Sequence, residues 1–167
     1  MGDYPQRCTA KLNELGAPLF GWICTDVVDL GEACFTCDLC GYDPIRYVHV
    51  MEHPNWSEKF SVGCVCDGTM SGDMLAAQQR DDEAKRKSAR KTNFMKKQWK
   101  ERPDGVMFLP HTRGGITAET DTFLGRDYYK VTVNGEQYQW LNNRRVETLD
   151  EAKRLAYEVL EYERKTD

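Results

Sequence analysis

Two closely spaced pairs of cysteines are the residues of this chain best suited to chemistry. Cys37 and Cys40 are separated by two residues and followed by Gly41, whereas Cys64 and Cys66 are separated by one. Zn²⁺ binds thiolates well and takes four ligands in a tetrahedron, with Zn–S distances of about 2.3 Å. The sequence therefore predicts a structural zinc site formed by Cys37, Cys40, Cys64 and Cys66. Four thiolates close the coordination sphere and leave no position for a substrate.

Other cysteines and histidines leave alternatives open for the ligand set. Cys34 could replace either member of the first pair, and His49 or His53 could replace one thiolate. Cys8 and Cys24 lie outside the cluster, and we interpret them as small apolar residues. The N-terminus has no basic start followed by an apolar stretch, so we expect a cytoplasmic protein. In that reducing compartment the seven cysteines favour metal binding over disulfides.

Elements that would position the two pairs can be predicted from residue type. Segment 19–30 is largely strand-like, and the β-branched and aromatic runs 45–51 and 60–66 predict a β-hairpin between the pairs. A cysteine knuckle, a hairpin and then cysteines leading into a helix resemble the treble-clef zinc-finger group over residues 34–80. The resemblance implies a structural zinc ion. The second pair departs from that group's commoner spacing, because it is Cys-x-Cys rather than Cys-x-x-Cys.

A basic segment follows the cysteines. Residues 71–100 are rich in helix formers and predict one long helix. Residues 69–102 carry ten basic and five acidic residues, whereas residues 1–68 carry four and ten, and residues 103–167 nine and twelve. Positive charge on a helix suits a nucleic-acid backbone, where each neutralised phosphate releases counterions. The predicted contacts are Lys85, Arg86, Lys87, Arg90, Lys91, Lys96, Lys97 and Lys100. The alternative is a solvated helix whose positive charge is balanced by acidic parts of its own chain.

The last third of the chain predicts short strands closed by a helix. Strands are expected at 106–109, 116–123, 128–133 and 136–141, with Asn134-Gly135 as a type I′ turn and a helix capped by Thr148. This order loosely resembles the sheet-plus-helix DNA-binding domain of phage integrase N-termini and AP2-type proteins, and also the double-stranded-RNA-binding fold. The resemblance implies nucleic-acid contacts by Lys130, Arg144 and Arg145, with Tyr128 and Trp140 beside them. For each of the two aromatic side chains, a place in the sheet core is the favoured interpretation.

Enzymatic function has one candidate. Residues 47–55 carry His49, His53 and Asn55 in an order that resembles HNH-type nucleases, which use histidine as general base beside a metal. No histidine follows Cys66 in the predicted helix, where that family places its last metal ligand, and a packed His49 is favoured. The sequence shows no Gly-rich phosphate loop or Ser nucleophile elbow. We therefore expect a binding protein rather than an enzyme.

The predicted architecture is α+β: a treble-clef-like zinc module (residues 1–70), a basic connecting helix (71–102), and an antiparallel sheet of three or four strands packed with one helix (103–167). We expect a zinc-stabilised nucleic-acid-binding protein, a bacterial or phage regulatory or accessory protein, with DNA favoured over RNA. The rival hypothesis is an adaptor or inhibitor that grips a nucleic-acid-processing protein complex. Apolar runs are too short to span a bilayer, and no small-molecule substrate is evident.

Overall fold

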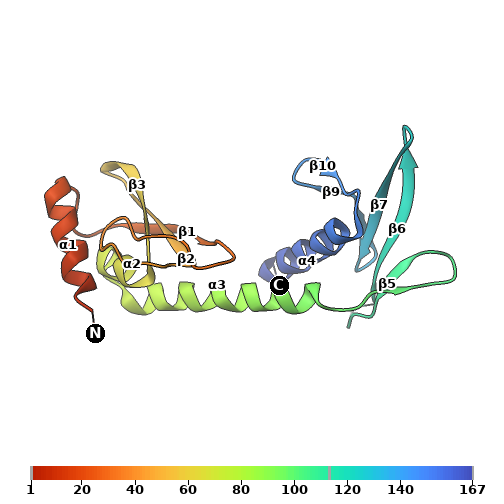
Figure 1. Cartoon of the computed structure of the whole chain (residues 1–167), viewed down its shortest axis with the longest axis horizontal. Coiled ribbons are helices and arrows are strands. Elements are labelled where there is room, and N and C mark those ends of the chain that lie inside the picture. The colour runs from red at the N-terminus through yellow and green to blue at the C-terminus, as the bar shows by residue number, and fades with distance from the viewer. Residues whose placement is uncertain (1, 113, 167) are drawn as a thin grey trace. The chain divides into compact units, whose positions relative to one another are not determined.

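The computed structural model describes residues 2–112 and 114–166. Over these ranges the chain is α+β, with four helices and three antiparallel sheets. It divides into two units, Met1–Ala89 and Arg90–Asp167, and the boundary falls within helix α3 (Met74–Met95). Figure 1 shows the elements of each unit. Among the described helices, none combines the length and the apolar character needed to cross a bilayer.

The first unit is built on a three-stranded sheet. Its elements are α1 (Tyr4–Leu15), β1 (Ile23–Asp29), β2 (Tyr47–His53), β3 (Trp56–Val62), α2 (Cys64–Ser71) and the first part of α3. The strands pair antiparallel in the order β1-β2-β3. The predicted hairpin between the two cysteine pairs is confirmed as β2–β3, with Met51 opposite Phe60. Both side chains lie in the core of the unit, together with Leu12, Trp22 and Met70.

Helix α1 was not predicted from the sequence. It buries Cys8 and Leu12, which lie one turn apart and therefore on the same face. Gly16 ends the helix in the left-handed conformation (φ 68°) and its N–H bonds back to Asn13 O at 3.1 Å. With only a short apolar stripe, such a helix gives a weak periodic pattern, although its C-terminal glycine is typical.

The predicted helix 71–100 is observed as α3, and a separate helix, α2, precedes it and shares only Ser71 with the predicted range. Gly72 (φ 75°) ends α2, and Asp73 caps the start of α3 by accepting a hydrogen bond from the Ala76 N–H at 2.9 Å. Helix α3 ends at Met95, five residues earlier than predicted. Lys100 lies instead in a strand, because it pairs with Phe108 at the edge of the second unit's sheet.

The second unit is a five-stranded sheet, a small hairpin and a helix. Its further elements are β4 (Lys100–Glu101), β5 (Met107–Leu109), β6 (Ile116–Phe123), β7 (Arg126–Val133), β8 (Glu136–Tyr138), β9 (Trp140–Leu141), β10 (Arg144–Arg145) and α4 (Leu149–Thr166). The sheet order is β4-β5-β6-β7-β8, and β9 pairs with β10. The predicted strand 136–141 is thus divided between two sheets. The main sheet has five strands, whereas three or four were predicted.

Alternation along the strands makes the core of this unit. Ile116, Ala118, Val131 and Val133 are fully buried or nearly so, and α4 packs on β7 with Ala152, Leu155 and Ala156 in the same cluster (Figure 1). The predicted Asn134-Gly135 turn is confirmed, since both residues have positive φ and join Val133 to Glu136. Thr148 Oγ1 accepts a hydrogen bond from the Glu151 N–H at 3.2 Å, as expected for the cap of α4.

Candidate functional site

A tight turn presents the first cysteine pair. The Cys37 N–H bonds to Tyr42 O at 2.9 Å, and the Gly41 N–H bonds to Cys37 O at 3.1 Å. Gly41 has φ 70°, a conformation that a residue without Cβ adopts at little cost. The turn is closed by pairing of Phe35 with Ile45. Both Cys37 and Cys40 are buried by this arrangement.

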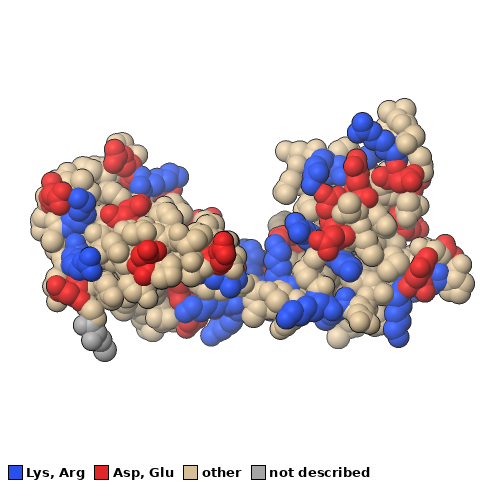
Figure 2. Space-filling view, viewed as in Figure 1, with Lys and Arg blue, Asp and Glu red and all other residues tan. Residues whose placement is uncertain are grey.

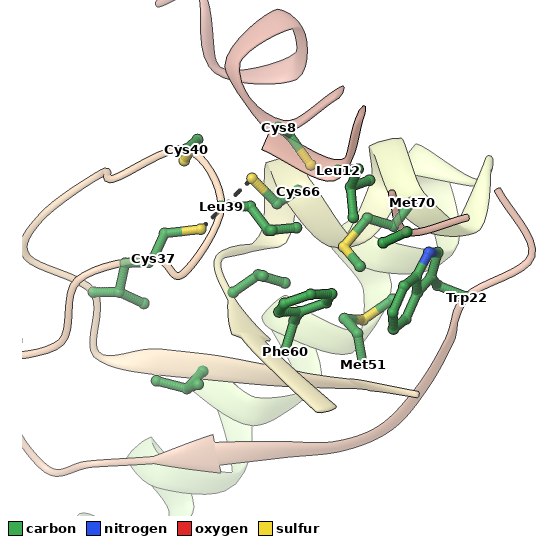
Figure 3. Packing of buried hydrophobic residues seen from close by; sticks show 14 residues of the cluster. Cys8, Leu12, Trp22, Cys37, Leu39, Cys40, Met51, Phe60, Cys66 and Met70 are labelled. Carbon is green, nitrogen blue, oxygen red and sulfur yellow. Dashed lines mark hydrogen bonds between the residues drawn. The ribbon is translucent and has the colours of Figure 1, made fainter. Parts of the chain in front are cut away.

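Helix α2 supplies the third thiol. Cys66 lies in the first turn of α2 and is buried, with its sulfur 3.6 Å from the Cys37 sulfur (Figure 3). The sulfurs of Cys37, Cys40 and Cys66 all lie within 4.8 Å of one another. A buried group of three sulfurs at this spacing could hold a metal ion that prefers thiolates, such as Zn²⁺. The chemistry of this donor set therefore fits the predicted metal.

Cys64, the fourth predicted ligand, does not join this group. Its sulfur lies 3.9 Å from Gln78 Oε1 on α3. Successive helical residues are rotated by about 100°, so residues two apart, such as Cys64 and Cys66, point to nearly opposite sides of α2. Among the alternatives, Cys34 is exposed, and His53 Nδ1 accepts a hydrogen bond from the Asn55 N–H at 3.1 Å.

In the absence of a cation, electrostatic repulsion disfavours the loss of protons from all three thiols together. Interaction with the Cys66 thiol lowers the pKa of Cys37 to about 5, and backbone amides of the turn and of Gly63 add to that effect. The same interaction raises the pKa of Cys66, and burial raises the pKa of Cys40. One thiolate is therefore favoured and two protons are retained. A divalent cation would reverse that preference, because it replaces the protons as the positive partner.

A second buried group surrounds His49. Its Nδ1 lies 2.6 Å from Asp67 Oδ2 and its Nε2 lies 3.4 Å from Asp81 Oδ1, while the Cys24 sulfur lies 4.0 Å from Nδ1. Arg80 donates to both oxygens of Asp67. Burial opposes protonation of His49, but hydrogen bonding to Asp67 outweighs it and raises the His49 pKa to about 9.

This second group is a buried cluster of paired polar side chains. His49 is fully buried, and both of its ring nitrogens face carboxylates. The expectation of a packed, hydrogen-bonded His49 is confirmed. At the hairpin turn the His53 ring accepts a hydrogen bond from the Asn55 backbone N–H.

The basic half of α3 carries five of the residues predicted to bind nucleic acid, and Figure 2 shows Lys and Arg side chains along it; Lys96, Lys97 and Lys100 follow the helix. Many of these basic side chains pair with carboxylates of the same chain. Within the first unit Lys85 pairs with Asp81 at 2.6 Å and Arg86 lies 4.0 Å from Glu83. Within the second unit two further pairs form, Arg90 with Glu161 at 2.9 Å and Lys91 with Glu158 at 3.4 Å. Lys87, Lys96, Lys97 and Lys100 are exposed.

The basic residues predicted on the sheet differ in their surroundings. Lys130 pairs with Asp121, and Arg144 pairs with Glu151. Arg145 instead lies against aromatic rings, with its guanidinium carbon 4.1 Å from the Phe123 centroid, 4.6 Å from Tyr128 and 5.4 Å from Trp140. We call these four residues the arginine–aromatic cluster. The sequence named three of its members but missed Phe123, which the β6–β7 turn brings beside them.

Comparison of the chain with protein-family models, with curated proteins and with solved structures finds no match in any of the three. The buried group of three cysteines and the basic residues therefore carry the functional interpretation by themselves.

Proposed function

We propose that this chain is a zinc-stabilised nucleic-acid-binding protein, as an accessory or regulatory protein of a bacterium or phage. The thiols of Cys37, Cys40 and Cys66 support the zinc ion. The order of a cysteine turn, the β2–β3 hairpin and a cysteine on α2 supports a treble-clef-like module. In this proposal zinc is structural, and the nucleic acid contacts the second unit.

The arginine–aromatic cluster carries the proposal. Phe123 is 51% exposed and Trp140 is 54% exposed, although both rings are large and apolar. Tyr128 is buried, so the expectation of a core residue holds for Tyr128 but not for Trp140. Exposed rings beside an arginine form a surface on which bases stack, and each stacked base is worth about 1–3 kcal/mol by alanine substitution.

Basic residues lie close in sequence to the members of this proposed stacking surface. Arg126 begins β7 and is exposed, and Arg144, although paired with Glu151, keeps most of its side chain in solvent. Lys96, Lys97 and Lys100 of the same unit supply further cations for phosphates. The helical residues Lys85, Arg86, Arg90 and Lys91 are the weaker part of the predicted contact surface, because each already faces a carboxylate.

Stacking also favours a class of nucleic acid. Bases within a duplex already stack on one another, whereas unpaired bases are free to stack on protein rings. We therefore propose that the preferred ligand is single-stranded, with duplex DNA bound more weakly through its phosphates.

The test is fluorescence anisotropy of the zinc-loaded full chain with labelled single-stranded DNA, duplex DNA and duplex RNA at two salt concentrations. Trp140→Ala is expected to weaken binding by about 5- to 150-fold. Tyr162→Ala is the matched control, because it removes an aromatic ring that is 71% exposed on α4 of the same unit. Its affinity should stay within about twofold of the parent. Equal losses in the two variants, or no salt-dependent binding to any of the three ligands, would refute the proposal.

A protein-interaction adaptor is the second candidate, and the β6–β7 turn favours it. Leu124 has φ 51° and is 88% exposed, although a bulky residue rarely occupies that conformation. The exposed side chains of Leu124 and Phe123 adjoin in sequence, and exposed apolar patches mark protein interaction sites. Binding of a protein complex that survives Trp140→Ala but is lost on Leu124→Asn, without affinity for free nucleic acid, would favour this candidate.

A further inference from the structure

The buried cysteine group has three sulfurs within 4.8 Å of one another, whereas structural zinc takes four ligands. A tetrahedron with Zn–S bonds of about 2.3 Å has sulfur–sulfur edges of about 3.8 Å. The Cys37–Cys66 separation of 3.6 Å is close to such an edge. A fourth donor is therefore expected within reach of these sulfurs.

Cys64 is poorly placed to be that donor. It begins α2 two residues before Cys66, so the helix directs the two side chains to nearly opposite sides. To reach the ion, the first turn of α2 would have to unwind, and the Asp67 N–H would lose its 3.0 Å hydrogen bond to Gly63 O. The Cys24 sulfur lies near His49 instead, in the other buried group.

Cys8 is the cysteine beside the group. It is fully buried in α1, which packs on α2, and its thiol interacts with the Cys66 thiol. Figure 3 shows the Cys8 sulfur next to that of Cys66, in a core that also holds Leu12 from the same face of α1. The three-sulfur group within 4.8 Å does not include Cys8, so its sulfur would move toward the ion on binding.

We propose that Cys8 is the fourth ligand and that the zinc site is Cys8, Cys37, Cys40 and Cys66. One Zn²⁺ binds four thiolates, so each of the four groups that still carries a proton releases it, and the centre has charge −2. Arg7 lies near enough to offset this charge. Its Nη2 is 3.5 Å from the position that a Cβ would take at Gly41, the residue that follows Cys40. The metal then joins α1 to the cysteine turn and to α2, so that the N-terminal helix depends on zinc for its place in the first unit.

The inference rests on the proposed zinc site, and zinc K-edge X-ray absorption of the full chain tests the two separately. The parent protein and Cys64→Ser are both expected to show four sulfurs at about 2.3 Å. Cys8→Ser is expected to show three sulfurs and one lighter atom, or to lose its zinc. Cys34→Ser is the matched control at an exposed cysteine and should keep four sulfurs.

The outcomes differ for the two hypotheses. A parent protein that binds no zinc would overturn the zinc site itself. A parent protein that binds zinc through four sulfurs would support the zinc site. The role of Cys8 would then be overturned if Cys64→Ser drops to three sulfurs or loses zinc. It would also be overturned if Cys8→Ser keeps four sulfurs. Because Cys64 is only partly buried, its serine variant retains the core packing, and this arm decides the question even if Cys8→Ser does not fold.

Discussion

Replacing Asp67 by asparagine removes the charge that holds the buried polar core of the first unit together. The Asp67 carboxylate is fully buried and lies 2.6 Å from His49 Nδ1 and 2.7 Å from an Arg80 nitrogen. Removing one partner of a buried ion pair costs about 3–5 kcal/mol, because the other charge stays buried without compensation. His49 can escape part of this cost by losing its proton, so we expect Asp67→Asn to cost about 3 kcal/mol near pH 6.

The same contact predicts how stability depends on pH. The folded-state pKa of His49 is raised to about 9, above the value of about 6.5 in an unfolded chain. The stabilisation is therefore complete below pH 6.5 and is lost as the pH rises through 9. The difference of about 2.5 pKa units corresponds to about 3 kcal/mol. In Asp67→Asn most of this pH dependence should disappear, so the parent and variant curves converge at high pH.

Urea unfolding of the zinc-saturated full chain between pH 6 and pH 10, followed by NMR signals of β2 and α2, measures this unit separately. Asp26→Asn is the control: Asp26 is exposed, and asparagine keeps the oxygen that accepts the Val27 N–H. The control should lose less than about 0.5 kcal/mol and keep the parent's pH dependence. An Asp67→Asn variant with the parent's slope between pH 6.5 and 9 would refute the role given to His49.

Three further predictions follow from the remaining contacts. Glu161→Gln removes the buried partner of Arg90 and should destabilise the second unit by about 2–3 kcal/mol. Glu158→Gln breaks the exposed pair with Lys91 and should cost less than about 1 kcal/mol. Urea unfolding followed by NMR signals of α4 measures both costs, and equal costs would contradict a stabilising role for the buried Arg90–Glu161 pair. Leu124→Gly relieves a positive φ and should raise the stability of the second unit by up to about 1 kcal/mol, measured in the same way; a loss of stability would contradict the strain. Chelation of zinc should increase hydrogen exchange in α1 and α2 but leave α4 protected, and equal increases in all three helices would argue against a metal confined to the first unit.

Sequence reasoning was sufficient for elements whose pattern is local. The β2–β3 hairpin, the Asn134-Gly135 turn and the Thr148 cap all depend on residues within a few positions of one another. The predicted helix 71–100 was wrong at both ends, because Gly72 ends α2, Asp73 caps the start of α3, and Lys100 pairs with Phe108 in a strand. Helix α1 was missed because two buried residues in twelve make a weak pattern.

For the site, the sequence named Cys37, Cys40 and Cys66 correctly as members of one group. It paired them with Cys64 because spacing alone does not say where a helix begins. Once α2 is known to start at Cys64, the rotation between Cys64 and Cys66 separates their side chains. Cys8 is distant in sequence and could be found only from the packing of α1 on α2. Likewise, Arg90 was expected on a phosphate-binding surface, but its carboxylate partner lies 71 positions away.

Zinc analysis of the full chain, purified under reducing conditions without added metal, tests the central claim most directly. We predict one zinc ion per chain and four thiols that react with a thiol reagent only after chelation. The other three of the seven cysteines should react without it. A metal-free protein whose thiols react equally before and after chelator treatment would contradict the account.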